Sequence, residues 1–183
     1  MKRFLIVPSL VLAALLALCI LNAAALNRRT GRWMDQADRI AQLTEQQRWD
    51  QAQAAMDDAV AHARSRKAFG VQVGRFQQIE TLLTDMEVRL RNMRSMVYRA
   101  AWSIDAADET ERLDVALMKR YVPEASVRVA SDAMQILGGL GYTEGSRVSR
   151  IWEDCRGNQI AEGTDQVMVY IAAPLIMEHY RSF

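Results

Sequence analysis

The stretch Gln135-Ile136-Leu137-Gly138-Gly139-Leu140-Gly141-Tyr142 marks the sudden end of a long helical pattern. Before it, apolar residues recur at steps of three or four positions, the spacing that places them on one face of a helix. A helix that reaches Gly138 and Gly139 ends there, because glycine readily takes the positive φ that closes the last turn. The stretch therefore predicts a helix end at which bare backbone is exposed.

Two further motifs stand on either side of this stretch. Arg66-Lys67-Ala68-Phe69-Gly70 lies upstream of it, and Ile160-Ala161-Glu162-Gly163-Thr164 lies downstream. The carboxylate of Glu162, held in a tight Glu-Gly-Thr turn before a helix, is well placed to act as a base. A second interpretation is that Glu162 only stabilises the following helix through the helix dipole.

Helical periodicity continues through the rest of the chain after the N-terminal segment. It predicts a first stripe of apolar residues over positions 33–43, and a second over positions 52–66 that Phe69-Gly70 ends by glycine termination. The later helices are expected at about positions 75–105, 111–137, 147–155 and 164–180. Short connections between long helices make antiparallel neighbours, so we expect an all-α, up-down four-helix bundle. No strand pattern competes with it.

Composition excludes several classes of function. The chain has 183 residues, with 23 basic and 22 acidic side chains, so its net charge implies no surface for a polyanion. We therefore predict no nucleic-acid partner. The two cysteines, Cys19 and Cys155, are too few for a disulfide framework, and no cluster of residues predicts a metal site.

The N-terminal segment at positions 4–26 carries no charge and lies between Met1-Lys2-Arg3 and Asn27-Arg28-Arg29. It is long enough to cross a bilayer core of ~30 Å as a helix. We predict a signal anchor at positions 1–27, a helical linker or the start of the first bundle helix at positions 28–49, and the bundle at positions 50–183, in the cytoplasm. Export after signal cleavage near Ala23-Ala24-Ala25 is the alternative.

In this order and at this spacing, the three motifs resemble the C-terminal helical domain of the acyl-CoA dehydrogenases, flavoenzymes that desaturate acyl thioesters. The likeness runs from about position 50 to position 177. It implies FAD as cofactor, an acyl-CoA thioester as substrate, and association into oligomers through this domain. The domains that precede this one in the family have no counterpart here. The resemblance thus implies an enzyme that is incomplete on its own and binds FAD weakly or not at all, either a truncated product or one half of a split enzyme whose partner chain supplies the missing domains.

The resemblance also assigns roles to individual residues. Glu162 would abstract the α-proton of the thioester, which a carboxylate can do only in a site from which water is excluded. Arg66 would reach the pyrophosphate of a flavin held mainly by a neighbouring subunit, since a guanidinium makes paired hydrogen bonds to phosphate oxygens. The residues that match the family's flavin contacts are Arg66, Gln77, Gln135, Gly138, Gly139, Thr164 and Gln166. Of these, Thr164 and Gln166 match contacts to the flavin of the same subunit.

Four positions depart from the family pattern, and the first is Ala41, which stands where the family has an arginine. Ala161 stands where an aromatic residue usually precedes the glutamate, Glu153 replaces an arginine, and Pro174 stands where many members have an arginine near the substrate. These changes affect the expected substrate contacts more than the expected flavin contacts. The competing hypothesis is a non-enzymatic, membrane-anchored helical bundle used for association.

Overall fold

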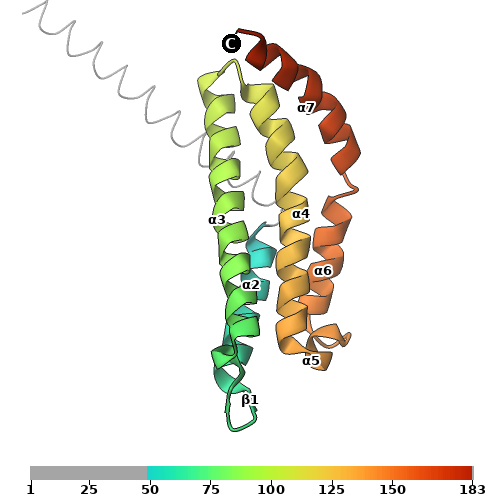
Figure 1. The fold of residues 1–183 in the computed structure, drawn as a ribbon. Helices are drawn as coiled ribbons and strands as arrows, with labels where there is room; N and C mark the ends of the chain where they lie inside the picture. The colour runs from blue at the N-terminus through green and yellow to red at the C-terminus, as the bar shows by residue number, and fades with distance from the viewer. Residues whose placement is uncertain (1–48, 183) are drawn as a thin grey trace, which may run out of the picture. The chain divides into compact units, whose positions relative to one another are not determined.

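The computed structural model describes residues 49–182 (Figure 1). The predicted anchor at positions 1–27, the apolar stripe at positions 33–43 and all but the last residue of the predicted linker lie outside the described residues. Six α-helices are present within positions 49–182: α2 (Trp49–Ser65), α3 (Gln77–Ala106), α4 (Glu111–Leu137), α5 (Gly139–Tyr142), α6 (Arg147–Asn158) and α7 (Asp165–His179).

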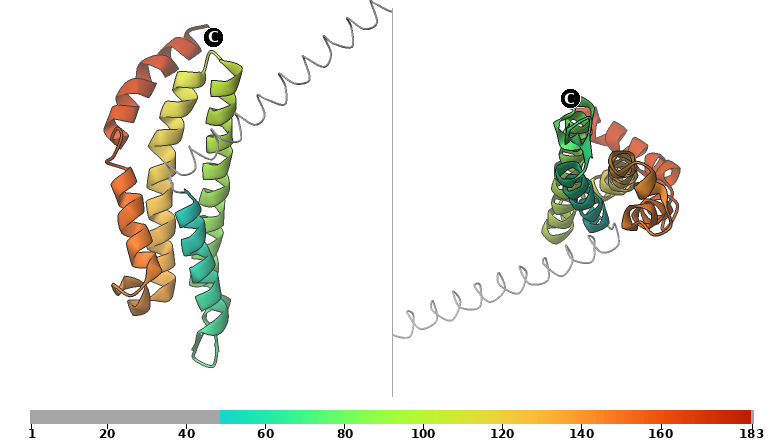
Figure 2. Two further views of the ribbon diagram at one scale, coloured as in Figure 1. Left: turned by 180° about the vertical axis from the view of Figure 1, so that it is seen from behind. Right: turned by 90° about the horizontal axis from the view of Figure 1, so that it is seen from below.

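α2, α3 and α4 run alternately down and up along a common direction, and α6 and α7 both run back along α4 in the direction opposite to it (Figures 1 and 2). α2, α3 and α4 pack against one another, while α6 and then α7 follow α4 along its other side. The prediction of an all-helical bundle is confirmed for these residues, and the predicted ranges of the last four long segments agree closely with α3, α4, α6 and α7. No helix within residues 49–182 is both long enough and apolar enough to cross a membrane.

The core lies between α2, α3, α4 and α6. α2 faces it with a stripe of alanines whose small side chains let the other helices approach closely: Ala52, Ala55, Ala59 and Ala63. The larger buried side chains come mostly from α3 and α4: Met86, Leu90, Met93, Val97, Met118, Val122 and Val129. α4 contacts every other long helix, so it is the element that positions the rest.

The end of α2 differs from the sequence prediction. The helix stops at Ser65, so Phe69 and Gly70 do not terminate it. Instead, strands β1 (Lys67–Ala68) and β2 (Val71–Gln72) pair antiparallel, and Phe69 and Gly70 form the turn between them with φ of 50° and 84°. Two successive positive φ values are typical of a tight two-residue hairpin. The prediction that no strand is present was wrong at this short hairpin.

Candidate functional site

The glycine turn after α4 leaves its backbone open. α4 ends at Leu137, and Gly138 follows with φ of 63° while its amide donates to the Gln135 carbonyl at 3.2 Å. A Cβ built on Gly138 or Gly139 would meet no atom of residues 49–182 within 4 Å. Gly141 is different, since its Cβ would come within 2.9 Å of the Leu137 Cβ. The third glycine is therefore needed for packing, while the first two leave free space.

Arg66 and the two open glycines lie on one cavity. The cavity has a volume of about 440 Å³, and its lining residues are His62, Arg66, Val73, Ile136, Leu137, Gly138, Gly139 and Leu140. The Arg66 backbone is fixed there, since its amide donates to the His62 carbonyl at 2.8 Å and its carbonyl accepts from the Val73 amide at 2.9 Å. The Arg66 side chain is exposed and forms no ion pair with a carboxylate of residues 49–182.

The two predicted glutamines stand apart from this cavity. Gln77 is the first residue of α3, and its carbonyl accepts a hydrogen bond from the Thr81 hydroxyl at 2.9 Å. Gln135 lies in the last turn of α4, and both glutamine side chains are exposed. Neither residue lines the cavity that holds Arg66. Both side chains point to solvent as far as residues 49–182 define it, so their amides could contact a ligand outside the cavity.

Glu162 lies in the turn between α6 and α7, as the sequence indicates. Glu162 and Gly163 both take positive φ, at 54° and 106°. Thr164 then caps α7, because its hydroxyl accepts a hydrogen bond from the Val167 amide at 3.3 Å. Gln166 follows in the first turn of α7 and is exposed. The Glu162 side chain is also exposed, so residues 49–182 of a single copy do not exclude water from it.

Lys119 of α4 holds this turn in place. Its Nζ donates hydrogen bonds to the carbonyls of Asn158, at 2.9 Å, and Ala161, at 3.0 Å. Only 9% of Lys119 is exposed. Burial lowers the pKa of its ammonium group, and the nearby carboxylates of Glu162 and Asp165 act in the opposite direction. The sequence prediction missed this residue, although a lysine at a core position of an apolar helix face was a detectable signal.

Asp165, to which the sequence analysis gives no role, connects the same turn to α4. Its carboxylate accepts a hydrogen bond from the Gln159 side chain at 2.7 Å and lies 3.7 Å from the Arg120 guanidinium. Asp165 is the first residue of α7, where a negative charge interacts favourably with the helix dipole. The stabilising role that the sequence also allowed for Glu162 is therefore filled by Asp165.

The predicted site residues form two separate groups in one copy of the chain. Arg66, Gly138 and Gly139 lie near α5, while Glu162, Thr164 and Gln166 lie at the junction of α6 and α7 (Figure 1). α6 separates the two groups. It has 12 residues, which corresponds to a length of about 18 Å. A ligand that contacts both groups at once would have to reach along the whole of α6.

Comparison with known proteins identifies the bundle. Residues 20–176 match the family described as acyl-CoA dehydrogenase, C-terminal domain. The probable acyl-CoA dehydrogenase YdiO of Escherichia coli (strain K12) is 41% identical over 131 residues, which are 72% of this chain and 34% of that protein. The chain thus spans about a third of the length of the curated relatives that it matches.

Two solved structures have the same bundle. An acyl-CoA dehydrogenase from Slackia heliotrinireducens DSM 20476 superposes with a TM-score of 0.72 at 51% identity, covering 84% of this chain and 40% of the other. Butyryl-CoA dehydrogenase from Megasphaera elsdenii superposes with a TM-score of 0.70 at 32% identity, covering 78% of this chain and 36% of the other. In both cases the matched part is well under half of the relative.

Proposed function

The chain belongs to the acyl-CoA dehydrogenase family, whose members are FAD-dependent enzymes, and we propose that it supplies the C-terminal part of an enzyme that desaturates acyl-CoA thioesters. The observation that carries this proposal is the cavity that joins Arg66 to Gly138 and Gly139. A family match alone would give the fold. The cavity adds a guanidinium that pairs with no carboxylate of residues 49–182, beside glycine backbone that no side chain of those residues covers, and this suits a phosphate-bearing ligand.

The residues of this chain fit FAD at two places. Arg66 would bind the pyrophosphate, and the bare backbone of Gly138 and Gly139 would allow the dinucleotide close approach. Thr164 and Gln166, at the N-terminus of α7, would hold the phosphate and ribityl part, where backbone amides favour an anion. When bound, FAD supplies the acceptor for the hydride that leaves the β-carbon of the substrate.

The distance between these two places supports a site shared by two copies of the chain. Arg66 and Gly138 of one copy lie too far from Thr164 and Gln166 of the same copy to hold one phosphate group. The family assembles through this domain, so we propose a homo-oligomer in which one copy supplies Arg66 and the next supplies Thr164. Each copy would then take part in two flavin sites.

Glu162 is the proposed base. Its carboxylate would take the α-proton of the acyl thioester, and this requires that water be kept away from it. Within residues 49–182 the Glu162 side chain is exposed, so the closure must come from outside this bundle. We propose two sources of this closure. One is a second copy of the bundle, and the other is a counterpart of the domains that the relatives carry outside the matched part, on whichever chain it lies.

FAD binding tests the proposal. The full chain alone is expected to bind FAD weakly, whereas a chimera carrying residues 20–176 in place of the matched part of the Slackia enzyme is expected to bind it tightly. In the chimera, Arg66→Ala should weaken binding about 10- to 150-fold, because hydrogen bonds to charged groups contribute ~1.5–3 kcal/mol. Equilibrium dialysis against FAD measures both effects.

Arg64→Ala is the matched control for this experiment. Arg64 is an exposed arginine in the last turn of α2, close to Arg66 in sequence, and it does not line the cavity. Equal losses for the two variants would show that the charge of the region, and not the Arg66 contact, supports FAD binding. A chimera that folds and binds no FAD would contradict the proposed function itself.

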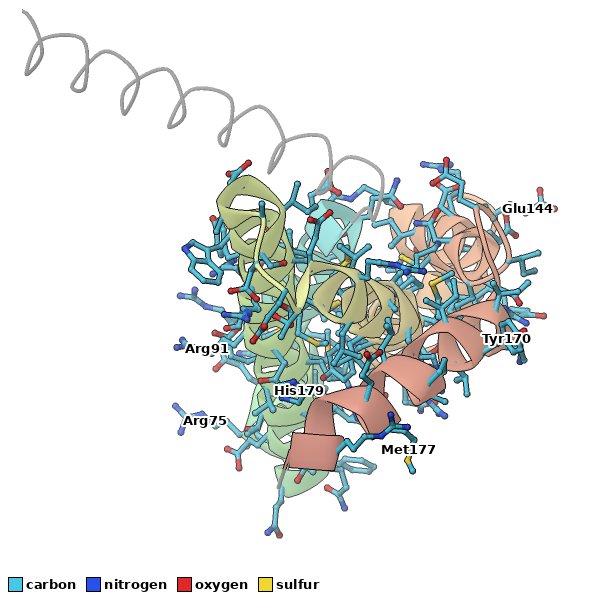
Figure 3. The ribbon with its side chains drawn as sticks, turned by 90° about the horizontal axis from the view of Figure 1, so that it is seen from above. Arg75, Arg91, Glu144, Tyr170, Met177 and His179 are labelled. Atoms are coloured by element: carbon cyan, nitrogen blue, oxygen red, sulfur yellow. The ribbon has the colours of Figure 1, made fainter. Side chains whose placement is uncertain are left out.

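A second candidate function is association without catalysis, and the outer face of α7 favours it. α7 is apolar on nearly all sides, and its exposed side chains include Val169, Tyr170 and Met177, which are 53%, 83% and 73% exposed. Tyr170 and Met177 project from the outer side of the helix (Figure 3). An exposed apolar face of this kind is typical of a surface that contacts another protein. In that case the chimera would assemble but bind no FAD.

We further propose that the segment at positions 4–26 attaches the chain to a membrane, with the bundle on the cytoplasmic side, where acyl-CoA and FAD are found. The uncharged length of this segment supports the proposal. The full-length product is expected to stay with membranes after an alkaline carbonate wash and to keep its unprocessed mass. A mature N-terminus near Leu26 would instead show signal cleavage. Protease added outside intact cells should not degrade the bundle.

A further inference from the structure

We infer that Lys119 is a positioning residue for Glu162: its two hydrogen bonds fix the turn between α6 and α7 and so set where the Glu162 carboxylate lies. The inference rests on the proposed role of Glu162 as the base. Lys119 itself is not proposed to touch the substrate, because its Nζ is occupied by the carbonyls of Asn158 and Ala161.

The two bonds close the segment that leads to Glu162. Asn158 is the last residue of α6, where carbonyls have no partner within the helix. The Ala161 carbonyl belongs to the peptide unit that joins Ala161 to Glu162. A single ammonium group thus ties the start of the turn to the residue directly before the proposed base. The Ala161 amide adds a third restraint, since it donates to the Gly157 carbonyl at 2.9 Å.

The backbone of Glu162 needs such a restraint. Its φ of 54° lies in the left-handed region, which costs free energy for a residue with a Cβ. A conformation of this kind persists only where the surroundings determine it. Gly163 takes positive φ easily, but Glu162 does not. The contact from α4 supplies the surroundings, because Lys119 is buried in the core side of the helix and is not free to move away.

The choice of lysine supports a specific role. The chain has three lysines and twenty arginines. Among residues 49–182 the other lysine is Lys67, which is exposed at the hairpin. A buried charge is costly unless it is paired by hydrogen bonds. An ammonium group is compact and directs several donors from one atom, which suits two carbonyls that lie close together, whereas a guanidinium spreads its donors over a planar fork.

The test reads the Glu162 backbone directly, in the full chain labelled with 15N and 13C. A positive φ gives a strong intraresidue NOE between the amide proton and Hα. In Lys119→Met, which keeps a long apolar side chain but has no donor, the strong NOE of Glu162 should be lost. Signals from the buried side chains of Val97 and Val129 should stay unchanged, since the variant leaves the core packing between α3 and α4 intact. Lys67→Met, at the exposed hairpin, is the matched control and should change nothing at Glu162.

An unchanged Glu162 NOE in folded Lys119→Met would overturn the inference. If this variant does not fold, Lys119→Gln replaces it, because its shorter amide reaches at most one of the two carbonyls and the same loss is expected. If neither variant folds, the inference is tested in the unmutated chain. The measurement is the scalar coupling across the hydrogen bonds, from the Lys119 15Nζ to the carbonyl carbons of Asn158 and Ala161. The presence of these couplings supports the inference, and their absence overturns it.

The result is distinguishable from a failure of the proposed function. The NMR measurement needs neither FAD nor acyl-CoA, so it can succeed even if the chimera proves inactive. In an active chimera, Lys119→Met is expected to lower kcat for α-proton exchange and to leave the KM for acyl-CoA nearly unchanged, because Lys119 acts through Glu162. An equal change in KM would show a general loss of the site instead.

Discussion

Glu162→Gln is expected to reduce the exchange of the substrate α-hydrogen with solvent by at least about 10²-fold, the lower end of what a positioned general base contributes. Glutamine keeps the shape of the side chain but cannot accept the proton as a carboxylate does. The measurement is deuterium uptake at the α-carbon of an acyl-CoA in deuterated water, catalysed by the chimera with the Slackia enzyme. FAD binding should be nearly unaffected, because Glu162 is not one of the proposed flavin contacts.

Glu144→Gln provides the matched control. Glu144 is also an exposed carboxylate in a connection between helices (labelled in Figure 3), but it lies between α5 and α6, at the end of α6 opposite to Glu162. Its replacement should leave exchange unchanged. If Glu162→Gln exchanges at the rate of the unmutated chimera, Glu162 has no part in proton abstraction. If no version exchanges while all bind FAD, the chain keeps the cofactor site without the reaction.

The rival interpretation of Glu162, as a residue that only favours the helix that follows, predicts a different result. Such a contribution is worth ~0.3–1 kcal/mol and falls off outside the first turn. Glu162 stands before the capping residue Thr164, whereas Asp165 occupies the first turn of α7. The structure thus gives this task to Asp165, and a change of Glu162 should alter the stability of the bundle very little.

The sequence predicted the long helices well because their signals are local. Apolar residues at helical steps and the paired glycines after Leu137 gave the bounds of α4, and the Glu-Gly-Thr turn gave the start of α7. The sequence did not predict the hairpin after α2, because each of its strands has only two residues, too few to show the alternation of a strand. The same glycine, Gly70, fits the end of a helix and the turn of a hairpin equally well.

The candidate site was only partly predictable, for a different reason. Arg66 and Gly138 are far apart in sequence, and only the packing of α2 beside α4 brings them to one cavity. The contact between Lys119 and Ala161 joins positions 42 residues apart and depends on how α6 returns along α4. Periodicity shows which residues share a helix face, but it does not show which loop that face meets. The resemblance supplied the residues that match flavin contacts. The structure added Lys119, whose hydrogen bonds hold the turn that contains Glu162.

Leu90→Ala is expected to lower the free energy of unfolding by ~2–5 kcal/mol, the usual cost of removing a large side chain from a packed core. Leu90 is 1% exposed on α3, within the core that α3 shares with α2 and α4. Each kcal/mol should lower the Tm by roughly 2–4 °C for a chain of this size. Thermal unfolding of the full chain, followed by circular dichroism at the helix signal, measures the shift.

Val88→Ala is the control for this change, because Val88 lies on the same helix but is 52% exposed. The Tm of the Val88→Ala variant should therefore shift by far less.

The comparison also separates folding from function. The core made by α3 and α4 positions both the Arg66 cavity and the Lys119 contact, so its loss should weaken FAD binding and α-proton exchange together as the protein unfolds. Variants of Arg66 and Glu162 should affect one activity each at an unchanged Tm. A Leu90→Ala chain as stable as Val88→Ala would mean that α3 and α4 do not form the shared core on which both proposed sites depend.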